Sequence, residues 1–392
     1  MLILHGAKVV TATSVVEGGD VSVEGEHIVA VGDIEPDERA ETLDLSGHWL
    51  LPGFVDLHNH GGGGGSYAIG DQESALAAFR FHRGHGTTTS IASMVTAPVD
   101  QLAHDIAAMS ELVEDGVLAG IHLEGPFISA LRCGAHDPTL LREPDPAALR
   151  RLVDAGHGTV RMVTLAPELT GGIAAVRMLV DAGVIAAVGH TDADTATAMR
   201  AFDAGASVAT HLFNGMRPIN HREPGPVVAA LQSEHVTVEL INDGIHLHQS
   251  TVDMAFQSIG SRRIAFITDA ISAAGLPDGE FALGSMHVRV ENGAAMISGT
   301  NVLAGSTVTL DAVLRRGVQV DGLPIVDVSA ALSGTPARAL GLADRLGTIA
   351  AGQQADLLVL DADLTVVGVL ARGRWVEPLT SSVAAKALSA NQ

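Results

Sequence analysis

Cysteine and long apolar runs are the scarcest features of this chain of 392 residues. Its one cysteine, Cys133, excludes a disulfide within the chain, which is typical of a reducing compartment, so we expect a cytoplasmic protein. No apolar run approaches the roughly 18–20 residues that cross a bilayer. The amino terminus lacks the basic start and the apolar core of a signal peptide. The sequence therefore predicts no membrane association.

Positive charge is also scarce. The chain has 23 Lys and Arg residues against 45 Asp and Glu residues, which gives a formal net charge of −22. Such a charge repels nucleic acids and anionic membranes, so we expect neither as a partner. Lys8 and Lys386 are the only lysines, and a phosphorylated substrate would need arginines placed close to it.

A large folded core is nevertheless expected, because 47% of the residues are hydrophobic and only 17% are charged. The length corresponds to two or three ordinary domains, or to one barrel with additions. Residues 1–50 alternate in short strand-like pieces, and residues 346–380 do the same. Because neither end is long enough to bury a core alone, we expect both to form one small β-sandwich, followed by a tail at 381–392.

Residues 51–345 have a different pattern, in which short apolar runs are separated by helix-like stretches. This pattern indicates buried parallel strands with crossover helices. Eight repeats favour an α/β fold of the (β/α)8 TIM-barrel type, and a doubly wound open sheet is the alternative. Residues 276–300 are predicted to form inserted hairpins. The eight runs are Gly53–His58, Thr87–Val95, Val117–Glu124, Val160–Pro167, Val184–His190, Ser207–Leu212, Val236–Ile241 and Arg263–Asp269.

Residues that can bind a metal recur where these runs end. In a barrel the carboxyl ends of all strands meet at one mouth, so these side chains become neighbours. Each of them alone has an ordinary structural explanation, such as a core histidine or a capping carboxylate, but together they suit zinc or another divalent first-row metal. The set is His58, His60, Glu124, His190, His211 and Asp269.

Several stretches of the chain resemble the amidohydrolase superfamily, and within it the N-acetylglucosamine-6-phosphate deacetylases. The H-x-H pattern and the strand-end Asp are common to the superfamily, whereas the HLEGPF, HLFNGM and DGIH stretches are more specific. The matching segments are 52–60, 122–127, 134–136, 189–191, 210–216, 242–246 and 268–270.

The resemblance implies that Glu124, His190 and His211 hold one metal ion. His58 and His60 define a second position, so one or two ions remain open. Zinc is expected first, with iron, manganese or cobalt as alternatives. Many relatives bridge two ions with a carboxylated lysine, but both lysines here lie near the chain ends, so Glu124 would serve instead.

The resemblance also implies a reaction, which is hydrolysis of the acetamide of N-acetylglucosamine 6-phosphate to glucosamine 6-phosphate and acetate. Asp269 would act as general base on the attacking water and later return the proton to the leaving amine. His136 would polarise the acetyl carbonyl and stabilise the oxyanion.

Substrate binding is implied for four further residues. Asn214 and the amide of Gly215 would hold the phosphate, and His246 would contact the sugar or the phosphate. Arg222 resembles the family arginine that reaches the phosphate of a neighbouring subunit, so a homodimer is expected.

Two other functions remain open. The same metal set serves enzymes that open a cyclic amide, such as dihydroorotase-like enzymes, and these would have no phosphate requirement. A metal-stabilised binding protein without activity is the second alternative, and it would release no acetate.

Overall fold

The computed structural model describes residues 1–35 and 39–377, which form two compact units. The first unit contains Met1–Val55, His82–Thr89 and the described residues from Leu310 onward. The second contains Asp56–Phe81 and Ser90–Thr309. The sequence-based boundaries at 50 and 345 stay predictions, and the expected tail at 381–392 lies outside the described residues.

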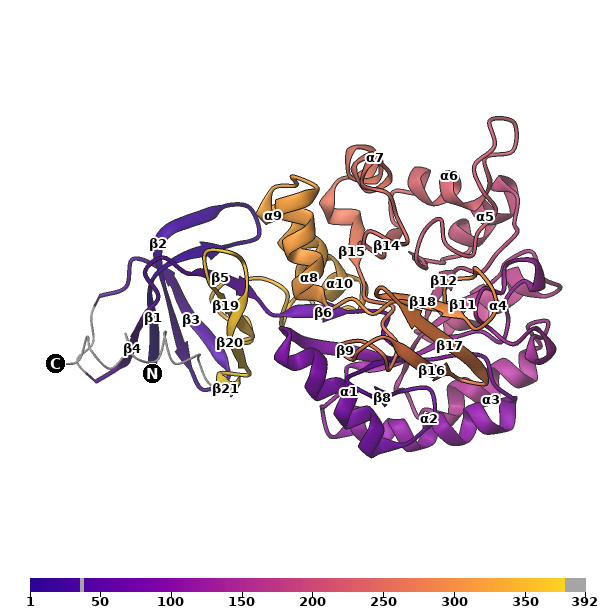
Figure 1. The fold of residues 1–392 in the computed structure, drawn as a ribbon, viewed down its shortest axis with the longest axis horizontal. Helices are drawn as coiled ribbons and strands as arrows, with labels where there is room; N and C mark the ends of the chain where they lie inside the picture. The colour runs from indigo at the N-terminus through magenta and orange to yellow at the C-terminus, as the bar shows by residue number, and fades with distance from the viewer. Residues whose placement is uncertain (36–38, 378–392) are drawn as a thin grey trace. The chain divides into compact units, whose positions relative to one another are not determined.

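Both ends of the chain build the β domain of the first unit, as predicted. Its eight strands form one sheet in the order β21-β20-β19-β5-β1-β2-β3, with β4 paired to β1 (Figure 1). Strands β5 and β19 pair antiparallel, and residues from both ends of the chain share one buried core. The strands are β1 Leu2–Val10, β2 Val15–Glu24, β3 His27–Gly32, β4 Glu41–Asp44, β5 Trp49–Pro52, β19 Leu357–Leu360, β20 Val366–Ala371 and β21 Arg374–Glu377.

A second eight-stranded sheet forms the barrel. Its strands follow one another in chain order, from β6 through β9 to β15, and neighbours from β9 to β15 pair in parallel. Beyond the strand ends, the Asp269 N–H donates to the His58 carbonyl over 2.8 Å and joins the last strand to the first. A doubly wound sheet would reverse its strand order, so that alternative is wrong. The strands are β6 Phe54–Asp56, β9 Thr87–Met94, β10 Gly120–Glu124, β11 Val160–Leu165, β12 Ile185–Val188, β13 Val208–Ala209, β14 Thr237–Leu240 and β15 Ile264–Phe266.

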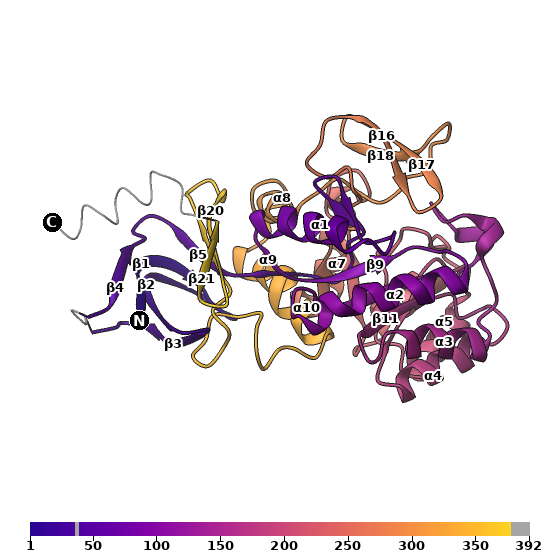
Figure 2. The same cartoon turned by 90° about the horizontal axis from the view of Figure 1, so that it is seen from below.

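Helices connect the barrel strands and lie outside them, as Figure 2 shows for α2 to α5. Local capping fixes where several begin. The Asp145 side chain accepts from the backbone N–H groups of Ala147 and Ala148 at the start of α3, where Pro146 takes the first helical position. The helices are α1 Gln72–Gly84, α2 Val99–Glu114, α3 Pro146–Ala155, α4 Gly172–Asp181, α5 Thr195–Asp203, α6 Gly225–Gln232 and α7 Gln249–Ile259 in the barrel, and α8 Leu310–Arg315, α9 Ile325–Ser329 and α10 Thr335–Ala339 further along the chain.

The hairpins predicted within 276–300 form a three-stranded antiparallel sheet of β16 Gly279–Leu283, β17 Met286–Glu291 and β18 Ala294–Ile297. In the glycine run at 61–65, β7 Gly61–Gly62 pairs with β8 Gly65–Ser66. A side chain on Gly65 would place its Cβ 2.2 Å from the Ser74 carbonyl oxygen, so this close packing requires glycine. Within the described residues, no helix combines the length and the apolar character needed to span a bilayer.

Candidate metal and active site

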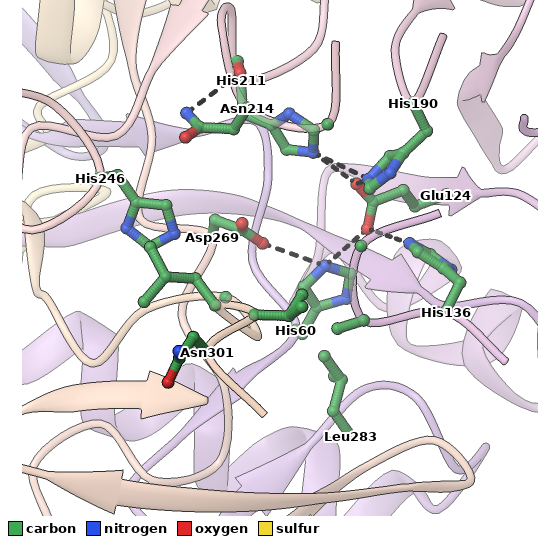
Figure 3. A pocket seen from close by; sticks show the side chains of 16 residues that line it. His60, Glu124, His136, His190, His211, Asn214, His246, Asp269, Leu283 and Asn301 are labelled. Atoms are coloured by element: carbon green, nitrogen blue, oxygen red, sulfur yellow. Dashed lines mark hydrogen bonds and ion pairs between the residues drawn. The ribbon is translucent and has the colours of Figure 1, made fainter. Parts of the chain in front are cut away.

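The six predicted metal-binding residues meet beyond the carboxyl ends of the barrel strands. Five of them line a cavity of about 250 Å³ (Figure 3), and His58 lies against them, fully buried. The cavity is lined by His60, Glu124, Gly134, Ala135, His136, His190, His211, Asn214, Gly215, His246, Asp269, Leu283, Asn301, Val302, Leu303 and Gly305.

Glu124 stands between two pairs of histidines. Its Oε1 lies 3.0 Å from His190 Nε2 and 2.9 Å from His211 Nε2, and we call these three residues the first metal position. Its Oε2 lies 3.4 Å from His58 Nε2 and 3.1 Å from His60 Nε2. The Glu124 carboxylate therefore faces one pair of histidines with Oε1 and the other pair with Oε2.

Asp269 completes the group around the second pair. Its Oδ1 lies 3.4 Å from His58 Nε2 and 3.2 Å from His60 Nε2, and we call His58, His60 and Asp269 the second metal position. Together with Glu124, these residues offer four ligand atoms within 4.8 Å of one another.

His60 and His190 are oriented by hydrogen bonds from their second ring nitrogens. The Nδ1–H of His60 donates to the Ser93 carbonyl over 3.0 Å, and that of His190 to the Arg132 carbonyl over 2.8 Å. A carbonyl only accepts, so Nδ1 carries a proton in both rings and Nε2 is the nitrogen that faces Glu124. The Nε2 atoms of His190 and His211 lie 3.1 Å apart and both lie within 3.0 Å of Glu124 Oε1, so three possible ligand atoms face one point. Imidazole and carboxylate donors held in this way suit a divalent first-row metal.

Charge at the centre agrees with this assignment. Burial raises the pKa of Glu124, but His58 and His190 more than offset it and hold the pKa well below its usual range. Burial also raises the pKa of Asp269, yet His58 and His60 bring it down to about 2. Burial lowers the pKa of His60, whereas hydrogen bonds to Asp269 and Glu124 raise it to about 9. The two carboxylates thus stay ionised and stabilise positive charge between them, which a metal ion can supply in place of a proton.

His136 is oriented differently from His60 and His190, although with Glu124 and His190 it also forms a group that could hold a metal ion. The Thr96 backbone N–H donates to His136 Nδ1 over 3.3 Å, so the ring proton lies on Nε2, which points to Glu124 Oε2 at 3.4 Å. Burial lowers the pKa of His136 to about 4, because the ring is desolvated. His136 is therefore a neutral hydrogen-bond donor at the edge of the metal centre.

The predicted substrate-binding residues divide into two groups. Asn214, Gly215 and His246 line the cavity. His246 Nδ1 lies 2.7 Å from Asp243 Oδ2; burial lowers the pKa of His246, but Asp243 raises it overall. Arg222 is exposed and does not line the cavity of its own chain.

Three of the metal-centre residues have a left-handed backbone, with φ of 46° at His190, 28° at His211 and 48° at Asp269. Their strands end before them, two residues earlier for His190 and three for Asp269. His58 and His60 also lie past their strand, which ends at Asp56. The predicted runs, which reach His58, His190 and Asp269, are therefore longer than the strands. The predicted convergence of the side chains was right, because turns at the strand ends aim them inward.

Residues beyond the predicted set also shape the site. Thr96 and Ser93 orient His136 and His60, and the loop after β18 lines the cavity from Asn301 to Gly305. Glu239 lies fully buried on β14 and contacts His58 and His211. The sequence signal for Glu239 is a lone carboxylate inside the apolar run 236–241, which a core strand does not need.

Comparison with known proteins identifies the family. The amidohydrolase family pattern matches residues 49–376. The N-acetylglucosamine-6-phosphate deacetylase of Bacillus subtilis is 33% identical over 385 residues, covering 95% of this chain and 96% of the relative. An N-acetylgalactosamine-6-phosphate deacetylase of Escherichia coli is 34% identical over 330 residues, which cover 83% of this chain and 87% of the relative.

A solved structure gives the same answer. The crystal structure of N-acetyl-D-glucosamine-6-phosphate deacetylase from Mycobacterium smegmatis superposes with a TM-score of 0.92 at 44% identity, covering 96% of this chain and 100% of that one. The structure of a mutant of that enzyme in complex with N-acetyl-D-glucosamine-6-phosphate superposes with a TM-score of 0.93 at 44% identity. The match covers 96% of this chain and 99% of the mutant chain. The chain therefore belongs to the amidohydrolase family, among the relatives of the N-acetylglucosamine-6-phosphate deacetylases.

Proposed function

We propose that the chain removes the acetyl group from N-acetylglucosamine 6-phosphate, giving glucosamine 6-phosphate and acetate. The observation that carries this proposal is the arrangement around Glu124, which faces two pairs of histidines next to the neutral donor His136. The names of the relatives that cover nearly the whole chain support this reaction over the opening of a cyclic amide. A purely metal-binding protein would leave the donor at His136 without a role.

The residues of the chain divide the chemistry among them. Glu124, His190 and His211 would hold one divalent ion and His58, His60 and Asp269 a second, with zinc expected first. When bound, such an ion activates water for attack at neutral pH. The distances between these side chains and the orientation of their rings support this assignment of ligands.

Asp269 would transfer protons, and His136 would stabilise the negative charge that develops during the reaction. Asp269, ionised and 3.2 Å from His60, would accept the proton of the attacking water and pass it to the leaving amine. The Nε2–H of His136 would donate to the acetyl oxygen, whose negative charge grows as water attacks. Removing one such donor elsewhere slows catalysis by about 10²–10³.

Recognition of the phosphate needs a cation from outside the cavity. No lysine or arginine is among the residues that line it. Asn214 and Gly215 would offer polar contacts, and glycine is required at 215, where φ is 58° and a Cβ would lie 2.9 Å from His190 Nδ1. Arg222 of a second copy would supply the charge in a homodimer, and His246 would bind a sugar hydroxyl or the phosphate. The single cysteine supports a cytoplasmic enzyme.

The test combines metal analysis with an assay of acetate release. The substrate panel contains N-acetylglucosamine 6-phosphate, its galactosamine epimer, unphosphorylated N-acetylglucosamine and dihydroorotate as a cyclic amide. We expect bound divalent metal and fastest acetate release from the glucosamine 6-phosphate. Faster release from the epimer would assign the function of the galactosamine relative. Turnover of dihydroorotate alone, or metal binding without any turnover, would overturn the proposal.

A further inference from the structure

Glu239 is a buried carboxylate to which the proposed reaction gives no role. It lies on β14, between Val238 and Leu240, with no exposed surface. Burying a charged carboxylate costs several kcal/mol unless a partner compensates for the lost water. Among the described residues, its Oε1 has no hydrogen-bond partner. Such a residue in a barrel core requires a reason other than packing.

The partners of the other oxygen supply that reason. Glu239 Oε2 lies 3.3 Å from Nδ1 of His58 and 3.2 Å from the backbone N of His211. Because this oxygen accepts the backbone N–H of His211, it is also the acceptor for His58, whose proton therefore lies on Nδ1. Nε2 is then the nitrogen left for a metal, and it lies 3.4 Å from both Glu124 and Asp269. Glu239 thereby selects the tautomer in which His58 can bind a metal.

The second contact reaches the first metal position. The N–H of His211 belongs to a residue with a left-handed backbone, φ 28°, and Glu239 accepts from it. The side chain of His211 has no comparable support, because its Nδ1 is buried without a partner among the described residues. One carboxylate therefore orients a ring at one metal position and fixes the main chain at the other.

The orienting partner of His58 also differs from the others in charge. His60 and His190 donate to neutral backbone carbonyls, whereas His58 donates to a carboxylate. A carboxylate behind an imidazole raises the basicity of the ring nitrogen that binds the metal. Its negative charge also lowers the energy of a divalent cation at the centre.

We propose that Glu239 is a positioning residue that makes His58 a competent metal ligand and so fills the second metal position. It acts through His58 and touches neither the substrate nor the reacting atoms. The inference rests on the metal centre proposed above.

The test measures zinc binding to the full-length metal-free chain by competition with a chromophoric chelator. In Glu239→Leu, which removes the acceptor and the charge, we expect the weaker-bound zinc to bind about 10- to 100-fold less tightly. Glu239→Gln keeps an acceptor but loses the charge, so we expect a smaller loss, about tenfold. Glu234→Leu changes an exposed carboxylate five residues earlier and should leave affinity unchanged.

A double-mutant cycle separates positioning from a general structural effect. If Glu239 acts mainly through His58, Glu239→Leu should weaken zinc binding much less in a His58→Ala background than in the wild type. Equal losses in the two backgrounds, or wild-type affinity in both Glu239 variants, would overturn the inference. If Glu239→Leu does not fold, the same comparison of zinc affinity is made with Glu239→Gln in the wild-type and His58→Ala backgrounds. A wild-type chain that binds no metal would overturn the metal centre itself, which is a distinguishable outcome.

Discussion

Arg222 offers the sharpest test of how a chain with a net charge of −22 binds a phosphorylated sugar. The guanidinium of Arg222 is exposed, and within the described part of the chain its side chain has no hydrogen bond or ion pair. Its removal should therefore leave the stability of the fold unchanged. All of the effect of Arg222→Ala should then appear in substrate binding.

The size of that effect follows from the bond that is lost. A charge-assisted hydrogen bond is worth about 1.5–3 kcal/mol, which corresponds to about 10- to 150-fold in affinity. No arginine or lysine is among the residues that line the cavity, so none can replace the lost contact with the phosphate. We expect KM for N-acetylglucosamine 6-phosphate to rise by this factor, while slow turnover of the unphosphorylated sugar stays the same. Arg177→Ala, which removes an exposed arginine on α4, is the matched control.

Mixed dimers test which subunit Arg222 serves. Chains carrying Arg222→Ala and chains carrying Asp269→Asn would each form inactive dimers at low substrate concentration. If Arg222 acts across the interface, one of the two sites in a heterodimer has an intact Asp269 from one chain and an intact Arg222 from the other. Random mixing should therefore recover about a quarter of wild-type activity. Verified heterodimers without activity would place Arg222 in its own subunit's site, and equal losses on both sugars in Arg222→Ala would refute a role in phosphate binding.

Three further results are expected. Glu124→Gln combined with His190→Asn should lose the first metal ion together with activity, and full metal content by elemental analysis would contradict the ligand assignment. Asp269→Asn should still bind substrate while kcat falls by about 10²–10⁴, and near-wild-type turnover would rule out its role as proton shuttle. Burial raises the pKa of Asp56 to about 6, so its contribution to stability is present below pH 4 and lost as the pH rises through 6. Relative to Asp56→Asn, the metal-free wild type should lose about 3 kcal/mol of unfolding free energy between pH 4 and 7, as measured by denaturant titration.

The barrel could be predicted because its strands are buried on both faces. The run Thr87–Val95 corresponds to β9 Thr87–Met94, and the run Val160–Pro167 to β11 Val160–Leu165. Strand ends were less accurate near the site, where β13 is reduced to Val208–Ala209. Apolar character continues past the last ladder hydrogen bond there, so composition alone extends the strand too far.

The predicted metal ligands converge because strand order alone brings the ends of barrel strands together. The partners that orient them could not be found in this way. Ser93 and Arg132 act through backbone carbonyls, which every residue has, so their residue types give no signal. Thr96 contacts His136 Nδ1 with its backbone N–H and with its hydroxyl, and a single threonine hydroxyl is too common in a sequence to mark this contact.

The left-handed backbone at His190, His211 and Asp269 implies a conflict between activity and stability. A residue other than glycine in this region costs about 1–3 kcal/mol, and these three positions need side chains that glycine lacks. Glycine would relieve this cost at each turn, but it would also remove a buried side chain from the site. The backbone at these three turns is therefore determined by the side chains that it presents, at a cost to the stability of the fold.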